Sequence, residues 1–203
     1  MTKALALVCT LKPSPAPSSS DVLARQVLGA LDRYGVAGDV IRVVDHDVAP
    51  GVERDMGGAD EWPRIADAVE AADILLISTP TWLGHMSSVA QRVLERLNAE
   101  LSQTDDANRP AMVGKVGMCA VVGNEDGAHK IIADVFQGLN DIGFTIGAQG
   151  STYWNDEAMG GRDYADLDGT PTAVATATES AARNAAHLAK LLAGAGYPDY
   201  PSK

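Results

Sequence analysis

Short apolar runs alternate with longer segments of helical spacing along the whole chain, and this alternation constrains the fold more than any other feature. The runs predicted as strands are Ala4–Cys9, Val40–Val44, Ile74–Ser78, Lys115–Val122 and Phe144–Ile146. Nearly continuous apolar strands are typical of a parallel sheet that is covered on both faces. With right-handed crossovers, the sequence therefore predicts an α/β three-layer sandwich with five parallel strands in the order 2-1-3-4-5.

The segments between these runs have the periodicity and the start signals of helices. A helix capped within Ser18–Asp21 is predicted through Leu31, and the others are predicted at Trp62–Ala71, Ser88–Leu101, Ala128–Ile142 and Thr172–Leu192. The stretch Gly147–Pro171 is predicted to be irregular. Its length and its anchors Tyr153, Trp154, Met159 and Tyr164 favour a lid or an interface arm, with a surface loop as the alternative.

Length and charge narrow the class of protein. The 203 residues fit one domain, residues 1–203, and the formal net charge of -11 without any run of Lys or Arg disfavours nucleic acid and anionic membrane as partners. No apolar segment approaches the roughly 20 residues of a membrane span, and no signal-peptide pattern is present, so a cytoplasmic location is expected. Cys9 and Cys119 lie in apolar runs and are predicted to be core residues, and no residues have metal-ligand spacing.

In a sheet of this order, ligands bind beyond the carboxyl ends of the strands, where the strand order reverses. The loops Thr10–Ser20, Thr79–Ser88 and Gly123–Ala128 should therefore converge. The first loop has no glycine, which excludes the dinucleotide and P-loop motifs, but it is rich in hydroxyls and opens a helix. Free N–H groups at a helix N-terminus favour an anion, and Lys12 adds a charge, so a phosphate monoester would suit this loop. The alternative is that Ser18 or Ser20 only caps the helix.

The other two loops favour a planar ligand. Trp82 directly follows the most apolar strand and is expected either in the core or as one wall of a site, and Gly84 would allow close approach of a ring. His85 is either a proton donor or a surface residue. In the third loop, backbone amides could bind the polar edge of a heterocycle. The alternative is an ordinary turn in which Asp126 favours the helix start.

Three segments carry a resemblance to a known family. Ser78–Ser88 resembles the S-P-T-aromatic-x-G-x-x-S loop of the NAD(P)H-dependent FMN reductase and quinone reductase branch of the flavodoxin-like superfamily, with Thr79 as an additional residue before the proline. Gly123–Gly127 is similar to a third flavin loop, and Tyr153–Asn155 is similar to the stretch after the fifth strand in related proteins. The first loop departs from the family pattern, because a Pro-Ser run replaces the usual glycine- and arginine-bearing turn.

The resemblance implies a flavodoxin-like fold with FMN as cofactor and NAD(P)H as co-substrate. Electrons would pass to a quinone or another small acceptor, in a homodimer or homotetramer. The alternatives are an electron carrier for protein partners and a flavin-free binding module. No catalytic residue is selected, although His85 or Tyr153 could donate a proton. The implied FMN contacts are Thr10, Lys12, Ser18, Ser19 and Ser20 at the phosphate, Pro80, Thr81, Trp82, Leu83 and Gly84 along the isoalloxazine, and Gly123, Asn124, Glu125, Asp126 and Gly127 at its pyrimidine edge.

Overall fold

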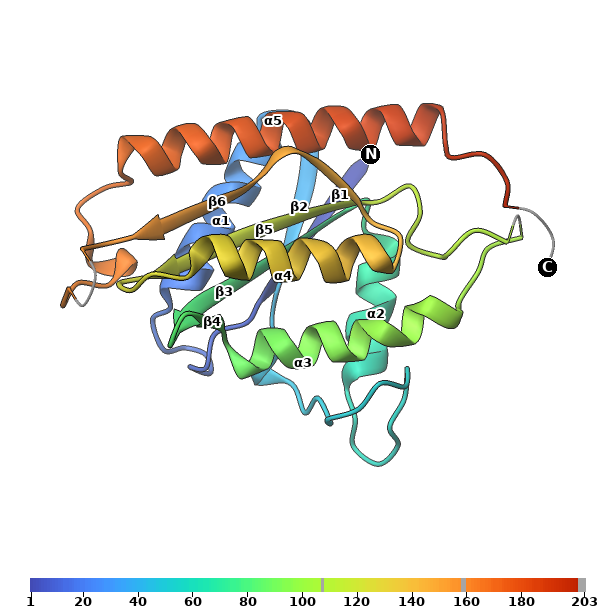
Figure 1. Ribbon diagram of the computed structural model, residues 1–203, viewed down its shortest axis with the longest axis horizontal. Coiled ribbons are helices and arrows are strands. Elements are labelled where there is room, and N and C mark those ends of the chain that lie inside the picture. The colour runs from blue at the N-terminus through green and yellow to red at the C-terminus, as the bar shows by residue number, and fades with distance from the viewer. Residues whose placement is uncertain (107, 158–159, 201–203) are drawn as a thin grey trace.

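A central sheet with helices on both faces forms the molecule (Figure 1). The computed structural model describes residues 1–106, 108–157 and 160–200. The parallel strands are β1 (Thr2–Val8), β2 (Val36–Arg42), β3 (Ile74–Trp82), β5 (Val116–Gly123) and β6 (Thr145–Asn155). They pair in the order β2-β1-β3-β5-β6. The predicted α/β sandwich and the predicted order of its five parallel strands are confirmed, and the fold is flavodoxin-like.

Two hydrophobic cores fill the space between the layers. The helices α1 (Ser19–Asp32) and α5 (Thr172–Gly194) cover one face, and α2 (Trp62–Ala71), α3 (Ser88–Leu97) and α4 (Ala128–Asp141) cover the other. Successive side chains of a strand point to opposite faces. Ala4, Ala6 and Val8 of β1 therefore join the first core, while the intervening leucines and Cys9 join the second. Both faces of each strand need apolar residues, which is why the strands appear in the sequence as nearly continuous apolar runs.

Short elements complete the chain and correct several predicted boundaries. Three 3₁₀ turns are described, η1 (Val43–Asp45), η2 (Asn98–Ser102) and η3 (Tyr164–Asp166). The second strand begins at Val36 rather than Val40, and η2 replaces the last turn predicted for α3. The prediction that Gly147–Pro171 is irregular was wrong for its first part, because β6 continues to Asn155. The register of β6 against β5 shifts between Gly117 and Cys119. Because the strand is irregular at this point, its full length was not predicted from the sequence.

The hairpin that ends β3 was not predicted from the sequence. This strand continues to Trp82 and pairs with β4 (His85–Met86) in antiparallel orientation. Leu83 and Gly84 form the two-residue turn, with φ of 51° and 75°. Positive φ at both positions is the requirement of a type I′ turn, which usually has Asn-Gly rather than Leu-Gly. The hairpin projects from the carboxyl edge of the sheet and carries Trp82 with it.

Gly127 allows this hairpin to pack closely against the loop that precedes α4. A Cβ atom added to Gly127 would lie 2.7 Å from the Cα atom of Gly84, and Gly127 itself has φ of 136°. Only glycine allows two backbones to approach so closely at this conformation. The position of Trp82 therefore depends on a backbone contact between two glycines.

We expect Gly127→Ala to displace the hairpin. The added methyl group meets backbone rather than a flexible side chain, so the free energy of unfolding should fall by about 1–3 kcal/mol. Gly169→Ala is the matched control, because a Cβ atom there has no neighbour within 4 Å. Urea unfolding of both variants checks this prediction, and equal stability of the two would contradict it.

Candidate functional site

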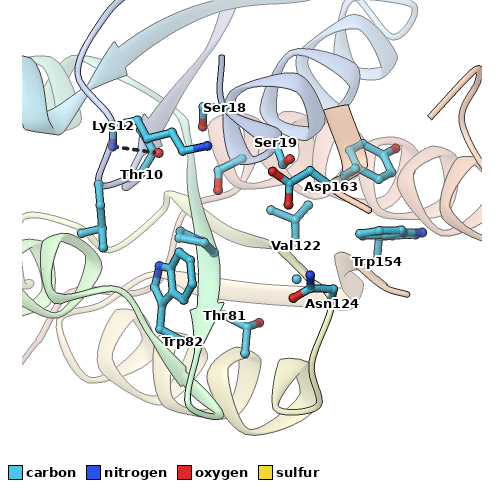
Figure 2. Close-up of a pocket in the computed structure, with 15 residues that line it drawn as sticks. Thr10, Lys12, Ser18, Ser19, Thr81, Trp82, Val122, Asn124, Trp154 and Asp163 are labelled. Atoms are coloured by element: carbon cyan, nitrogen blue, oxygen red, sulfur yellow. Dashed lines mark hydrogen bonds between the residues drawn. The ribbon is translucent and has the colours of Figure 1, made fainter. Parts of the chain in front are cut away.

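A cleft of about 610 Å3, partly open to solvent, lies at the carboxyl ends of the strands (Figure 2). All three predicted loops reach it. The predicted residues that line it are Thr10, Lys12, Ser18, Ser19, Ser20, Pro80, Thr81, Trp82, Gly123 and Asn124. The sequence thus placed the cleft at the edge of the sheet where the structure has it.

The hydroxyls of the first loop hold the backbone of this loop and of its neighbours. Ser18 Oγ accepts a hydrogen bond from the Asp21 amide at 3.3 Å, which confirms the capping interpretation for Ser18. Thr10 Oγ1 accepts one from the Lys12 amide at 3.3 Å, and Ser19 Oγ accepts one from the Ala165 amide at 3.2 Å. A hydroxyl that accepts a hydrogen bond still has its own proton to donate. Capping and anion binding are therefore compatible in the same side chain.

Arg42 at the end of β2 and Asp45 in the turn η1 fix the course of this loop. Arg42 Nη1 donates to the Ala16 carbonyl at 2.8 Å. The Asp45 carboxylate accepts from the hydroxyl of Ser14 at 2.6 Å and from its amide at 2.8 Å. These hydrogen bonds from Ser14 lower the pKa of Asp45, so Asp45 remains charged and keeps the anchor at neutral pH.

Trp82 is a wall of the cleft and not a core residue. Its side chain is 54% exposed, and the structure therefore decides between the two interpretations. Its neighbour Thr81 is buried, yet Thr81 Oγ1 has no hydrogen-bond partner among the described residues. A buried polar atom without a partner costs about 1–3 kcal/mol, and a ligand in the cleft with a polar edge would remove this cost.

The third loop meets the second across a narrow gap. A Cβ atom on Gly123 would lie 2.8 Å from the Thr81 Cβ atom, so a side chain at this position would crowd Thr81. Asn124, which also lines the cleft, donates through Nδ2 to the Gly160 carbonyl at 2.6 Å. The absence of a side chain at Gly123 therefore allows the third loop to lie close against Thr81 at this end of the cleft.

Five of the residues that the resemblance implied as contacts do not line the cleft: Leu83, Gly84, Glu125, Asp126 and Gly127. They form the junction between the hairpin and the third loop. Glu125 Oε1 accepts from the Leu83 amide at 3.0 Å, and Asp126 Oδ1 accepts from the Gly127 amide at 2.7 Å. Their contacts in the structure fix the hairpin, and Glu125 and Asp126 point to different partners, as expected of residues that are not an acid/base pair.

Sequence reasoning about the loops did not assign Leu11, Val122, Trp154, Asp163 and Tyr164 to the cleft, and these residues also line it. Trp154 was singled out only as an anchor and by its resemblance to related proteins. Its ring lies 5.4 Å from that of Tyr164, and both side chains are largely buried. Met159, another predicted anchor of this segment, lies outside the described residues. Tyr164 was likewise singled out only as an anchor, and Asp163 has no signal in the local sequence, because distant contacts bring both residues to the cleft.

None of the candidate proton donors lines the cleft. His85 is exposed at the hairpin, and Tyr153 Oη lies 3.0 Å from His129 Nε2 on the surface next to α4. Cys9 and Cys119 are buried, and burial raises the pKa of both thiols far above the usual range. They are core residues, as predicted.

No helix in the described ranges has the length and apolar character needed to cross a membrane.

This fold and cleft define a flavodoxin-like α/β protein. The sequence matches the profile of the NADPH-dependent FMN reductase family over residues 2–158, and the chain belongs to this family. That membership confirms the resemblance.

Two curated relatives match most of the chain but are longer proteins. The 8-demethyl-8-aminoriboflavin-5'-phosphate synthase of Streptomyces davaonensis is 31% identical over 176 residues, which are 82% of this chain and 68% of that protein. The divalent metal cation transporter MntH of Mycobacterium bovis is 40% identical over 168 residues, which are 81% of this chain but only 25% of that protein.

Solved structures are similar over nearly the whole chain. RosB with the bound intermediate 8-demethyl-8-formylriboflavin-5'-phosphate has a TM-score of 0.90 and 29% identity, over 97% of this chain and 82% of that chain. The NADH:FMN oxidoreductase EMOB in its apo form has a TM-score of 0.67 and 18% identity, over 100% of this chain and 97% of that chain, which is a likeness of fold.

We expect Trp82→Ala to weaken FMN binding about tenfold while leaving the fold intact. An aromatic contact is worth about 0.5–1.5 kcal/mol beyond area burial, and the exposed ring supports no core. Trp62→Ala is the control, because Trp62 is fully buried and its loss should cost about 3–5 kcal/mol of stability. The melting temperature of the apoprotein and the FMN dissociation constant are measured on the same samples. Unchanged affinity in Trp82→Ala would place the ring elsewhere.

Proposed function

We propose that this chain binds FMN in the cleft and passes electrons from NAD(P)H to a quinone or another small acceptor. The observation that carries this proposal is the placement of the unpartnered Thr81 hydroxyl and the exposed Trp82 ring in one cleft with the hydroxyl-rich start of α1. A phosphorylated planar heterocycle has a matching partner for each of these features. The family provides independent support for FMN.

Each group of residues would have a distinct task. The hydroxyls of Thr10, Ser18, Ser19 and Ser20 would donate to the phosphate together with backbone amides at the start of α1, and Lys12 would add a positive charge. Pro80 and Trp82 would pack on the ring, while Thr81 would hydrogen-bond its polar edge. The flavin itself supplies the redox chemistry, and the protein supplies position and electrostatics. Leu11 and Trp82 would keep the mouth of the cleft apolar, which suits the flat faces of a nicotinamide and a quinone.

A second candidate function treats the flavin as the substrate. The relatives that favour it are the synthase of an aminated riboflavin phosphate and the RosB structure that holds a formylated one. Both cover most of this chain. In that case the cleft would release a chemically altered flavin rather than retain an unchanged cofactor.

We also propose that the chain acts in the cytoplasm as a homodimer or homotetramer.

One experiment separates these functions. The purified protein is loaded with FMN and mixed with NADH or NADPH and a panel of quinones, other small acceptors and a redox protein. The flavin mass is then determined. The proposal expects multiple turnovers with at least one acceptor and an unchanged flavin mass. An altered mass would favour the second candidate, transfer only to a protein acceptor would favour an electron carrier, and failure to take up FMN would overturn the proposal.

The phosphate contacts have a separate test. Replacing Ser18 and Ser20 together by Ala should weaken FMN binding more than riboflavin binding, because each lost hydrogen bond to a charged group costs about 1.5–3 kcal/mol. Ser20→Ala alone avoids the loss of the Ser18 cap, and Ser88→Ala is the control because Ser88 is exposed and outside the cleft. Equal losses for FMN and riboflavin, measured by fluorescence titration, would place the phosphate away from α1.

A further inference from the structure

Leu83, at the tip of the β3–β4 hairpin, is exposed to solvent in a conformation that leucine rarely adopts. Its side chain is 89% exposed, more than that of any other large apolar residue in the described ranges except Met1. Its φ of 51° lies in the left-handed region, which Asn and Gly occupy far more readily than leucine. Leu83 therefore gives the folded chain little packing and an unfavourable turn residue.

The hairpin nevertheless holds Leu83 in a fixed place. The Leu83 amide donates to Glu125 Oε1 at 3.0 Å. The backbone of Gly84 lies against Gly127, where an added Cβ atom would be 2.7 Å from the Gly84 Cα atom. A side chain on a backbone that is already ordered loses less freedom when it binds a ligand. Leu83 is thus suited to a contact with a molecule outside the chain.

Two other exposed apolar side chains connect the hairpin with the cleft. Trp82 directly precedes Leu83 and is 54% exposed, and Leu11 in the first loop is 46% exposed. Both of them line the cleft, whereas Leu83 does not. Exposed apolar surface therefore begins at the wall of the cleft and continues along the chain to the hairpin tip.

The size of this surface favours a small ligand over a second copy of the chain. A stable interface between proteins uses about 20–30 residues on each side, and its centre is depleted of charged residues. Here charged, exposed residues stand directly beside the apolar ones. Lys12 follows Leu11, and the Asp126 carbonyl oxygen would lie 3.8 Å from a Cβ atom on Gly84. A narrow hydrocarbon chain fits such a surface better than a protein.

We propose that Trp82 and Leu83 bind the hydrocarbon tail of a quinone whose ring enters the cleft. This inference rests on the proposed function, and it specifies the acceptor as a tailed quinone. Reduction of the quinone ring to the hydroquinone takes a hydride from NAD(P)H and a proton from water, and the tail takes no part in that step. The tail leaves the cleft past Trp82 and covers Leu83, which explains why a leucine occupies a turn position suited to Asn.

The test compares two benzoquinones that differ at one ring position, which carries a methyl group in one and a decyl chain in the other. Dissociation constants are measured by calorimetry on the oxidised, FMN-loaded protein without NAD(P)H, and KM values are measured with it. The wild-type protein should bind the decyl quinone about tenfold or more tightly, because each fully buried methylene adds about fourfold. Leu83→Asn should reduce this preference by about three- to tenfold and leave the affinities for the methyl quinone and FMN unchanged.

Two further variants serve as controls. Leu83→Met keeps an apolar side chain and should retain the preference for the decyl quinone. Leu191→Asn should retain it as well, because Leu191 is 54% exposed near the end of α5, at the opposite edge of the sheet from the hairpin (Figure 1). The melting temperature of Leu83→Asn should equal or exceed that of the wild type, since Asn suits the positive φ of this turn.

The outcomes separate this inference from the proposed function. If the wild-type protein takes up no FMN, or reduces no quinone with NAD(P)H, the proposed function fails as well. If it reduces both quinones but binds them equally, or if Leu83→Asn keeps the full preference, only the role of Leu83 is refuted. A lower melting temperature of Leu83→Asn would make Leu83 a structural residue. A smaller mass of this variant in light scattering would make Leu83 a contact between copies, and either result would overturn the inference.

Discussion

The register between β1 and β3 fixes the positions of the first two loops at the cleft. Val8 pairs with Ser78, and the Cys9 amide donates to the Ser78 carbonyl at 2.8 Å, so the end of β1 lies beside Ser78 of β3. Ser87 then ties the ends together. Its hydroxyl donates to the Cys9 carbonyl at 2.6 Å and accepts from the Ala90 amide at 3.1 Å, which also caps α3. Because Ser87 is buried, these hydrogen bonds join the first loop, the hairpin and α3 into one rigid edge.

An acidic protein can bind an anion when its local donors outweigh its overall charge. The net charge is -11, but the effect of distant exposed carboxylates is screened within about 8 Å at physiological ionic strength. The donors at the start of α1 would act on a phosphate at contact distance, and the arrangement that holds them is partly independent of any ligand. Arg42 and Asp45 keep the loop in place, and Ser18 caps the helix. The site is therefore preorganised, and binding does not require ordering of the loop.

The sequence predicted the elements that local patterns determine and missed those that distant contacts determine. Apolar strands, helical periodicity and N-cap residues were enough for the order of strands and for the three loops of the cleft. The β3–β4 hairpin was missed because Leu83 occupies a turn position with positive φ where Asn or Gly would be the usual signal. The length of β6 was missed because Gly147 and Gly150 interrupt its pattern. Asp163 reaches the cleft through a contact between Ser19 and Ala165, which are 146 residues apart in sequence.

The three tryptophans differ in how much of their apolar surface is still exposed and can be buried by a ligand. Trp62 is fully buried between α2 and the sheet. Trp154 is 7% exposed, because Tyr164 covers it and α1 in turn holds Tyr164 through Gln26. Trp154 thus gains little further burial from a ligand and acts as a fixed support at its end of the cleft. Trp82 still exposes 54% of its surface, so the apolar area that a planar ligand can remove from water lies on the hairpin side. Affinity for the ring should therefore depend on how firmly Gly127 and Glu125 hold that hairpin.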